Sequence, residues 1–169
     1  MLTTGDSAPD FELPSTNGDD VRLSDVLAEG PAVLVFFRGT WCSYCAEQLR
    51  TFSALAYDLK RHLDVSVLPI TGDPLSDLVE MRDLFDLRLQ LLSDADLAVS
   101  TSYTEIEDNA KHGRIPVPAT YVVDEAAQVR YVDVGTRPDD RTYANYVRSF
   151  VRDGYVDPYP GTFPDPYTE

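Results

Sequence analysis

Both cysteines of this chain lie in one short motif, Trp41-Cys42-Ser43-Tyr44-Cys45, which comes shortly after the apolar run 32–37. A strand that ends in a turn and leads into a helix would place these thiols at the helix N-terminus. The unpaired backbone N–H groups and the helix dipole stabilise a thiolate there. A Cys-x-x-Cys pair at such a point can close into a disulfide and reopen. The motif therefore predicts redox chemistry rather than structural cross-linking.

A few other residues could support this chemistry. Trp41 would form an aromatic wall that limits water without sealing the sulfurs, and Arg38-Gly39-Thr40 supplies a cation and a flexible turn beside the thiols. Glu47 lies in the first turn of the same helix, where it could transfer protons or simply face solvent. Across the sequence, the segment Val117-Pro118-Ala119-Thr120 stands just before an apolar strand.

The composition is strongly acidic. Asp and Glu total 29 against 14 Lys and Arg, a formal net charge of −15, and the only lysines are Lys60 and Lys111. Such a surface repels nucleic acid and anionic membranes, so we expect neither as a partner. The balance of many Asp and few Lys resembles that of cytosolic proteins from extreme halophiles, whose self-repulsion is screened by salt.

The sequence shows no motif for metal binding, membrane insertion or export. Two cysteines and two distant histidines, His62 and His112, are a poor set of ligands for zinc, and there is no glycine-rich phosphate loop. We therefore expect no metal and no cofactor. The first residues show neither the basic nor the apolar region of a secretory signal, and no apolar run approaches the roughly 18 residues of a membrane helix. With a single cysteine pair, the expected compartment is the cytosol.

The apolar periodicity predicts one α/β domain over residues 1–152, followed by a tail over 153–169. The expected elements, in order, are an N-terminal hairpin around the turn 17–20, a short helix capped by Ser24, a strand at 32–37, a helix at 42–62, a strand at 65–70, a helix starting at 74 or 75, a short strand at 90–92, a helix at 95–103, a loop at 105–117, antiparallel strands at 120–124 and 129–134, and a helix starting at 139 or 140. The tail interleaves prolines with aromatic residues, which favours docking on the body or on a partner over regular structure.

Three segments of the sequence carry a family resemblance. They are Phe36-Phe37-Arg38-Gly39-Thr40-Trp41-Cys42-Ser43-Tyr44-Cys45, Pro118-Ala119-Thr120-Tyr121-Val122-Val123-Asp124, and the opening Gly5-Asp6-x-Ala8-Pro9-Asp10-Phe11. Together they resemble the peroxiredoxin-like (AhpC/TSA, redoxin) branch of the thioredoxin superfamily, over roughly residues 5–151. The resemblance implies a thioredoxin-like three-layer sandwich: a central mixed β-sheet with helices on both faces, and an N-terminal β-hairpin extension.

The resemblance also implies roles for Val117 and Pro118. Pro118 is expected to be a cis-proline that faces the disulfide, and the backbone of Val117 is expected to pair with a bound substrate strand. Pro116 is expected to be an ordinary trans proline. Because only about one in twenty X–Pro bonds in folded proteins is cis, the expectation for Pro118 is easily checked.

The two related subfamilies imply different nucleophiles. In thioredoxin-like enzymes the first cysteine of the motif attacks and the second resolves, which assigns attack to Cys42 and resolution to Cys45. On the peroxiredoxin pattern, Cys45 takes the peroxidatic position, Cys42 replaces a Thr, and Arg38 replaces a Pro. Pro118 stands near where peroxiredoxins keep an Arg. The chain thus lacks most of the residues that activate peroxide.

The sequence therefore favours a thiol–disulfide oxidoreductase that acts on disulfide-containing proteins, serves cell redox homeostasis and is recharged by a thioredoxin-type reductant. Two alternatives stay open. One is a peroxiredoxin-type peroxidase that reduces small-molecule hydroperoxides. The other is a non-catalytic thioredoxin-fold binding module that uses the tail 153–169 as its contact surface.

Overall fold

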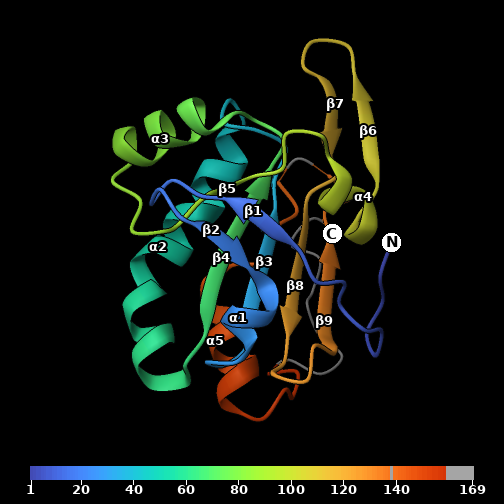
Figure 1. The fold of residues 1–169 in the computed structure, drawn as a ribbon. Helices are drawn as coiled ribbons and strands as arrows, with labels where there is room; N and C mark the ends of the chain where they lie inside the picture. The colour runs from blue at the N-terminus through green and yellow to red at the C-terminus, as the bar shows by residue number, and fades with distance from the viewer. Residues whose placement is uncertain (138, 159–169) are drawn as a thin grey trace, which may run out of the picture.

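The computed structural model describes residues 1–137 and 139–158 (Figure 1). Its helices are α1 (Leu23–Leu27), α2 (Ser43–Leu63), α3 (Leu75–Leu84), α4 (Ala98–Tyr103) and α5 (Ala144–Arg152). Its strands are β1 (Glu12–Pro14), β2 (Asp20–Arg22), β3 (Ala32–Phe36), β4 (Ser66–Thr71), β5 (Leu92–Ser93), β6 (Ile106–Asn109), β7 (Gly113–Pro116), β8 (Ala119–Val123) and β9 (Val129–Val134).

Strand β3 is the centre of the main sheet, whose order is β5-β4-β3-β8-β9. It runs parallel to β4 and antiparallel to β8, so that Leu34 lies opposite both Leu68 and Tyr121. Every residue of β3 is buried, as expected for an apolar run with strands on both edges and other elements on both faces. The predicted central mixed sheet is confirmed.

The side chains of β3 alternate between two cores. Val33 and Val35 belong to the core shared with α2, α3 and α5, whereas Leu34 and Phe36 belong to the core shared with α1, α4 and the β1–β2 hairpin. Figure 1 shows α1, β1 and β2 on the front of the sheet and α5 behind it. The expected three-layer sandwich with an N-terminal hairpin is therefore confirmed.

Helix α2 is the longest element and carries the two cysteines at its start. Cys42 is its N-cap residue, and Asp64 ends it in the left-handed conformation, with φ of 55°. Leu49, Phe52 and Leu59 lie on its inner face and are fully buried. This packing fixes the helix against the sheet, and its N-terminus becomes a rigid base for the thiols.

One expected loop turned out to be a hairpin. Residues 105–117 contain β6 and β7, which pair with each other from Ile106 opposite Pro116 to Asn109 opposite Gly113. Their exposed and half-buried polar side chains give no strand signal, and the pairing is a separate two-stranded sheet. In Figure 1 this hairpin projects beyond the main sheet.

Three helices begin at other residues than predicted, and a carboxylate takes part in each difference. Ser24 does not cap α1, since its N–H and hydroxyl both donate to the carboxylate of Asp10. Helix α5 begins at Ala144 rather than 139 or 140, because Asp140 instead accepts hydrogen bonds from the N–H and hydroxyl of Thr136. Helix α4 begins at Ala98 rather than 95, and the buried Asp94 accepts from backbone N–H groups in its first turn.

The start of the tail contacts the domain. The ring of Tyr155 lies 5.8 Å from that of Phe150, and the Arg130 guanidinium lies 4.7 Å over Tyr155. The remaining aromatic residues of the predicted docking segment, Tyr159, Phe163 and Tyr167, lie outside the described residues.

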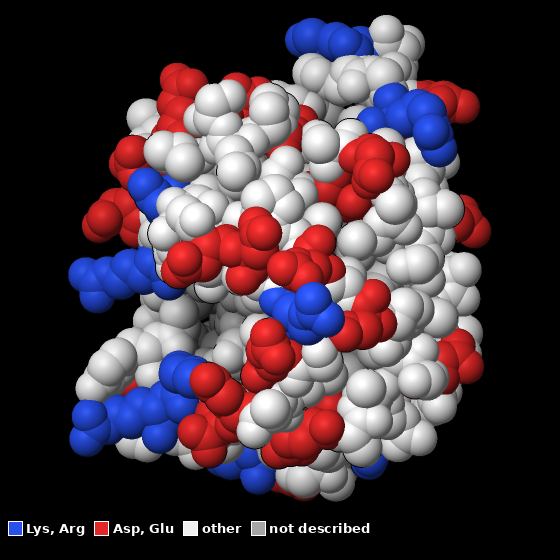
Figure 2. Space-filling model, viewed as in Figure 1, with Lys and Arg blue, Asp and Glu red and all other residues white. Residues whose placement is uncertain are grey.

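Carboxylates are spread over the face of the molecule in Figure 2, with Arg and Lys side chains between them. Among the described residues, no helix is long and apolar enough to cross a membrane.

Candidate active site

Cys42 and Cys45 lie where the chain passes from β3 into α2. Their sulfur atoms form a disulfide, and their Cα atoms are 5.2 Å apart. The backbone N–H of Cys45 donates to Sγ of Cys42 over 3.3 Å, so this sulfur lies at the free amide groups of the helix N-terminus. Cys42 is 5% exposed and Cys45 is fully buried. Cys42 is thus the more exposed of the two residues, and its sulfur is the one that lies at the helix N-terminus.

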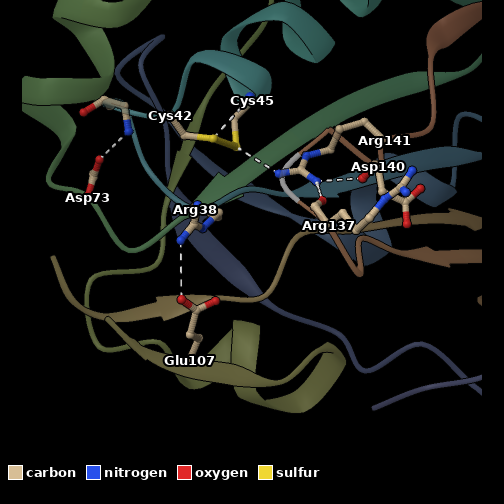
Figure 3. The surroundings of a disulfide bond; sticks show 9 residues. Arg38, Cys42, Cys45, Asp73, Glu107, Arg137, Asp140 and Arg141 are labelled. Carbon is tan, nitrogen blue, oxygen red and sulfur yellow. Dashed lines mark hydrogen bonds and ion pairs between the residues drawn. A yellow bond between two sulfur atoms is a disulfide. The ribbon is translucent and has the colours of Figure 1, made fainter. Parts of the chain in front are cut away.

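Arg141 lies against the buried sulfur. Its Nη2 atom is 3.9 Å from Sγ of Cys45 (Figure 3). Its Nη1 atom donates to the carbonyls of Arg137 and Asp140, which holds the guanidinium in place. Gly135 permits this packing, because a Cβ there would lie 2.7 Å from Nη1. A positive charge beside Cys45 stabilises a thiolate at that sulfur.

Arg141 is an unusual cation because it is buried. It is 9% exposed, and its Nε atom has no hydrogen-bond partner. Burial lowers the pKa of its guanidinium, and the nearby charge of Arg38 lowers it further. Both causes disfavour the charged form of the Arg141 guanidinium, so an anion bound close to it would stabilise that charge.

Arg38 and Trp41 lie in the turn between β3 and α2. The Arg38 guanidinium is 3.4 Å from Glu107 of the β6–β7 hairpin and 5.0 Å from the centre of the Trp41 ring. The Trp41 ring stacks on His112, at the turn of that hairpin, with ring centres 3.6 Å apart. A side chain at Gly39 would collide with the indole. The β6–β7 hairpin therefore forms one wall of the site.

Thr40 takes part through its backbone. Its N–H donates to the carboxylate of Asp73 over 2.7 Å, which ties the turn before the cysteines to the segment after β4 (Figure 3). Asp73 therefore holds the turn before the cysteine motif in place, a role that the sequence did not predict.

A cavity of about 240 Å³ opens beside these residues. It is lined by Arg38, Glu107, Val117, Pro118, Gly135, Thr136, Arg137 and Arg141. The fold brings together the end of β3, the β6–β7 hairpin and the segment that follows β9. Among the described residues, no group of His, Cys, Asp and Glu could hold a metal ion.

Residues 4–132, most of the chain, match the model of the AhpC/TSA family. The chain belongs to the AhpC/TSA family. The resemblance noted in the sequence is confirmed, and with it the expectation of a thiol-dependent oxidoreductase.

The relatives of this AhpC/TSA protein include both a thiol-disulfide oxidoreductase and a peroxidoxin. It is 27% identical to the thiol-disulfide oxidoreductase ResA of Geobacillus kaustophilus over 80% of the chain and 71% of that protein. It is 28% identical to the thioredoxin-like protein YneN of Bacillus subtilis over 80% of the chain and 74% of that protein. Among solved structures, peroxidoxin BcpB of Mycobacterium tuberculosis superimposes with a TM-score of 0.80 at 26% identity, covering 92% of this chain and all of BcpB.

One implication of the family resemblance is wrong for this AhpC/TSA protein. Among the described residues there is no cis peptide bond, so the bond before Pro118 is trans. The backbone of Val117 is also engaged within the chain: its N–H donates to the Glu105 carbonyl, and its carbonyl accepts from the hydroxyl of Thr104. These bonds anchor the end of the β6–β7 hairpin and occupy both backbone groups of Val117, whose pairing with a substrate strand stays a prediction.

A buried polar network lies under the site. Gln48, one turn after Cys45, donates to the Thr120 hydroxyl and the Thr142 carbonyl. The Thr142 hydroxyl in turn donates to Asp133, the pKa of which burial raises. Asp133 lies on β9 opposite Thr120 and is half-buried, so the network ends in a carboxylate that the sequence did not single out.

Proposed function

We propose that this AhpC/TSA protein reduces disulfides by thiol–disulfide exchange, with Cys42 as the nucleophile and Cys45 as the resolving thiol. The observation that carries the proposal is the unequal position of the two sulfurs. Cys42 is slightly exposed at the helix N-terminus, whereas Cys45 is fully buried one turn further on. An attacking thiolate must reach the substrate, but a resolving thiolate needs to reach only Cys42.

The exchange follows in two steps. The Cys42 thiolate attacks one sulfur of the substrate disulfide, which forms a mixed disulfide and releases the other half as a thiolate. The Cys45 thiolate then attacks Cys42, closes the Cys42–Cys45 bond and releases the second half. The substrate gains two electrons and takes up the two protons that the cysteines lose, while the enzyme dithiol becomes the disulfide.

Arg141 supports the second step in this proposal. Its charge, 3.9 Å from Sγ of Cys45, favours the thiolate form of a thiol that burial would otherwise keep protonated. The cycle closes when an external dithiol of thioredoxin type reduces the Cys42–Cys45 bond again.

The test is a turnover assay with two oxidants. Fully reduced protein, recharged by dithiothreitol, is given insulin disulfides or hydrogen peroxide at equal concentrations. The proposal expects insulin reduction well above the uncatalysed rate and slow peroxide consumption. Fast peroxide consumption with insulin reduction at the background rate would overturn it, and two inactive assays would favour the binding module.

A second candidate function is peroxide reduction at Cys45. The contact between Arg141 and Cys45 and the similarity to peroxidoxin BcpB favour it. In that reaction the Cys45 thiolate becomes a sulfenic acid with release of water or an alcohol, and the Cys42 thiol condenses with it, releasing a water molecule and forming the disulfide. The full burial of Cys45 argues against it as the first nucleophile.

The cytosolic location and the adaptation to high salt stay predictions. The net charge of −15 supports the second, since salt screens repulsion among exposed carboxylates. The melting temperature is therefore expected to rise by several degrees as KCl increases from about 0.1 to 2 M. Thermal unfolding followed by circular dichroism measures this, and a melting temperature indifferent to KCl would contradict the prediction.

A further inference from the structure

The cavity beside the disulfide is cationic in a chain that is otherwise strongly acidic. Three of its eight lining residues are arginines, Arg38, Arg137 and Arg141, and the only carboxylate among the eight is Glu107. The chain as a whole carries 29 acidic residues against 14 basic ones. The excess of positive charge at this cavity is thus opposite in sign to that of the molecule.

Two of these arginines have carboxylate partners, and for the third, Arg141, the described part of the chain shows none. Arg38 pairs with Glu107 at 3.4 Å, and Arg137 lies 3.7 Å from Asp139. Within residues 1–137 and 139–158, no carboxylate lies within the 4.0 Å of an ion pair from Arg141. Because Arg141 is also buried with its Nε unpartnered, the desolvation of its charge is only partly offset.

We propose that this cavity binds the carboxylate of a small anionic disulfide and so directs the neighbouring sulfur of that substrate to Cys42. The inference rests on the proposed function and names its substrate class. The Arg38 and Arg141 guanidinium groups, which lie close enough to repel each other, would share the bound anion, and Arg137, which lines the same cavity, would attract it further. A bound carboxylate would supply the counter-charge that Arg141 lacks.

A small molecule fits this site better than an extended polypeptide. The cavity has a volume of about 240 Å³, the size of a small organic anion. A peptide strand would need free backbone groups beside the disulfide, but the N–H and carbonyl of Val117 are both hydrogen-bonded within the chain. The β6–β7 hairpin also covers this side, through the contacts of Glu107 with Arg38 and of His112 with Trp41.

The test compares three disulfides of matched skeleton: dithiodipropionate, its neutral diamide, and the cationic cystamine. At low, fixed ionic strength, kcat/KM for dithiodipropionate is expected to exceed that for the diamide by about tenfold, with cystamine the slowest. Suberate, which has the same length but no S–S bond, is expected to inhibit the reduction of the diamide competitively.

Two sets of variants distinguish binding of the anion in the cavity from a general effect of the net charge of the protein. In Arg137→Gln the preference for dithiodipropionate should fall several-fold and suberate should inhibit more weakly, while Arg137→Lys should restore both. Arg22→Gln removes one charge from an exposed ion pair with Glu12, outside the cavity, and should change neither.

The outcomes distinguish this inference from the proposed function. Equal kcat/KM values for the three disulfides, or an equal loss of preference in Arg137→Gln and Arg22→Gln, would overturn the anion site and leave disulfide exchange standing. Reduction of none of the three, together with inactivity toward insulin, would overturn the proposed function itself.

Discussion

Replacing Cys42 with Ser should abolish disulfide reduction, lowering turnover by on the order of 10³-fold or more, because a serine hydroxyl does not attack sulfur at neutral pH. The fold should persist, since Cys42 contributes one small side chain at the start of α2. Steady-state insulin reduction measures the loss, and circular dichroism checks the fold.

Replacing Cys45 with Ser should have a different signature. The variant keeps the attacking thiol but cannot resolve the intermediate, so the mixed disulfide at Cys42 should accumulate after one turnover. Mass spectrometry of the intact protein, after mixing with a small disulfide, should show the added mass on a peptide that contains Cys42. If Cys42→Ser instead retained activity and formed the adduct at Cys45, the assignment of the two cysteines would be reversed.

The second large effect is expected at Arg141. Changing Arg141 to Met removes the charge 3.9 Å from Sγ of Cys45 and should slow the resolving step by about ten- to a hundredfold, the usual worth of a hydrogen bond to a charged group. The initial attack by Cys42 should change much less. Rapid mixing followed by acid quench separates the two steps.

A purely structural role of Arg141 would give a different result. Arg141 also holds the carbonyls of Arg137 and Asp140, so Met could simply loosen that segment. If the charge matters, the pH at which resolution is half-maximal should move upward in Arg141→Met and return toward the original value in Arg141→Lys. A resolving step with an unchanged pH profile in both variants would show that Arg141 acts only through packing.

The frame of the site could be predicted from local sequence. The apolar run of β3 and the spacing of Leu49, Phe52 and Leu59 by three and seven residues are strong periodic signals, and the cysteines lie at the junction between them. The cysteine positions follow from this junction alone. The two-layer alternation of β3 also follows, since a fully apolar strand must be covered on both faces.

The surroundings of the cysteines could not be predicted in the same way. Arg141 lies 96 residues after Cys45, in an Asp-rich stretch that the sequence predicts as the start of the last helix. Its contact depends on where the segment after β9 folds back, and no local pattern encodes that. The β6–β7 hairpin, with Glu107 and His112, was missed because its strands pair only with each other and most of their side chains are exposed or half-buried.

The expectation for Pro118 failed for a related reason. It was carried over from the family resemblance, whereas the peptide geometry before Pro118 depends on tertiary contacts. Here the Pro118 carbonyl accepts from Gly135, and both backbone groups of Val117 have partners within the chain. These contacts accompany a trans bond and a cavity lined by arginines in place of a strand-pairing surface.

The most direct test of the central claim is the alkylation rate of each thiol in the fully reduced protein, followed by iodoacetamide labelling across pH with peptide mass spectrometry. The account predicts that Cys42 reacts faster, with a half-maximal rate well below the pH of about 8.5 at which an ordinary free cysteine ionises, and that Cys45 stays nearly inert. Faster labelling of Cys45 than of Cys42 at neutral pH would contradict it.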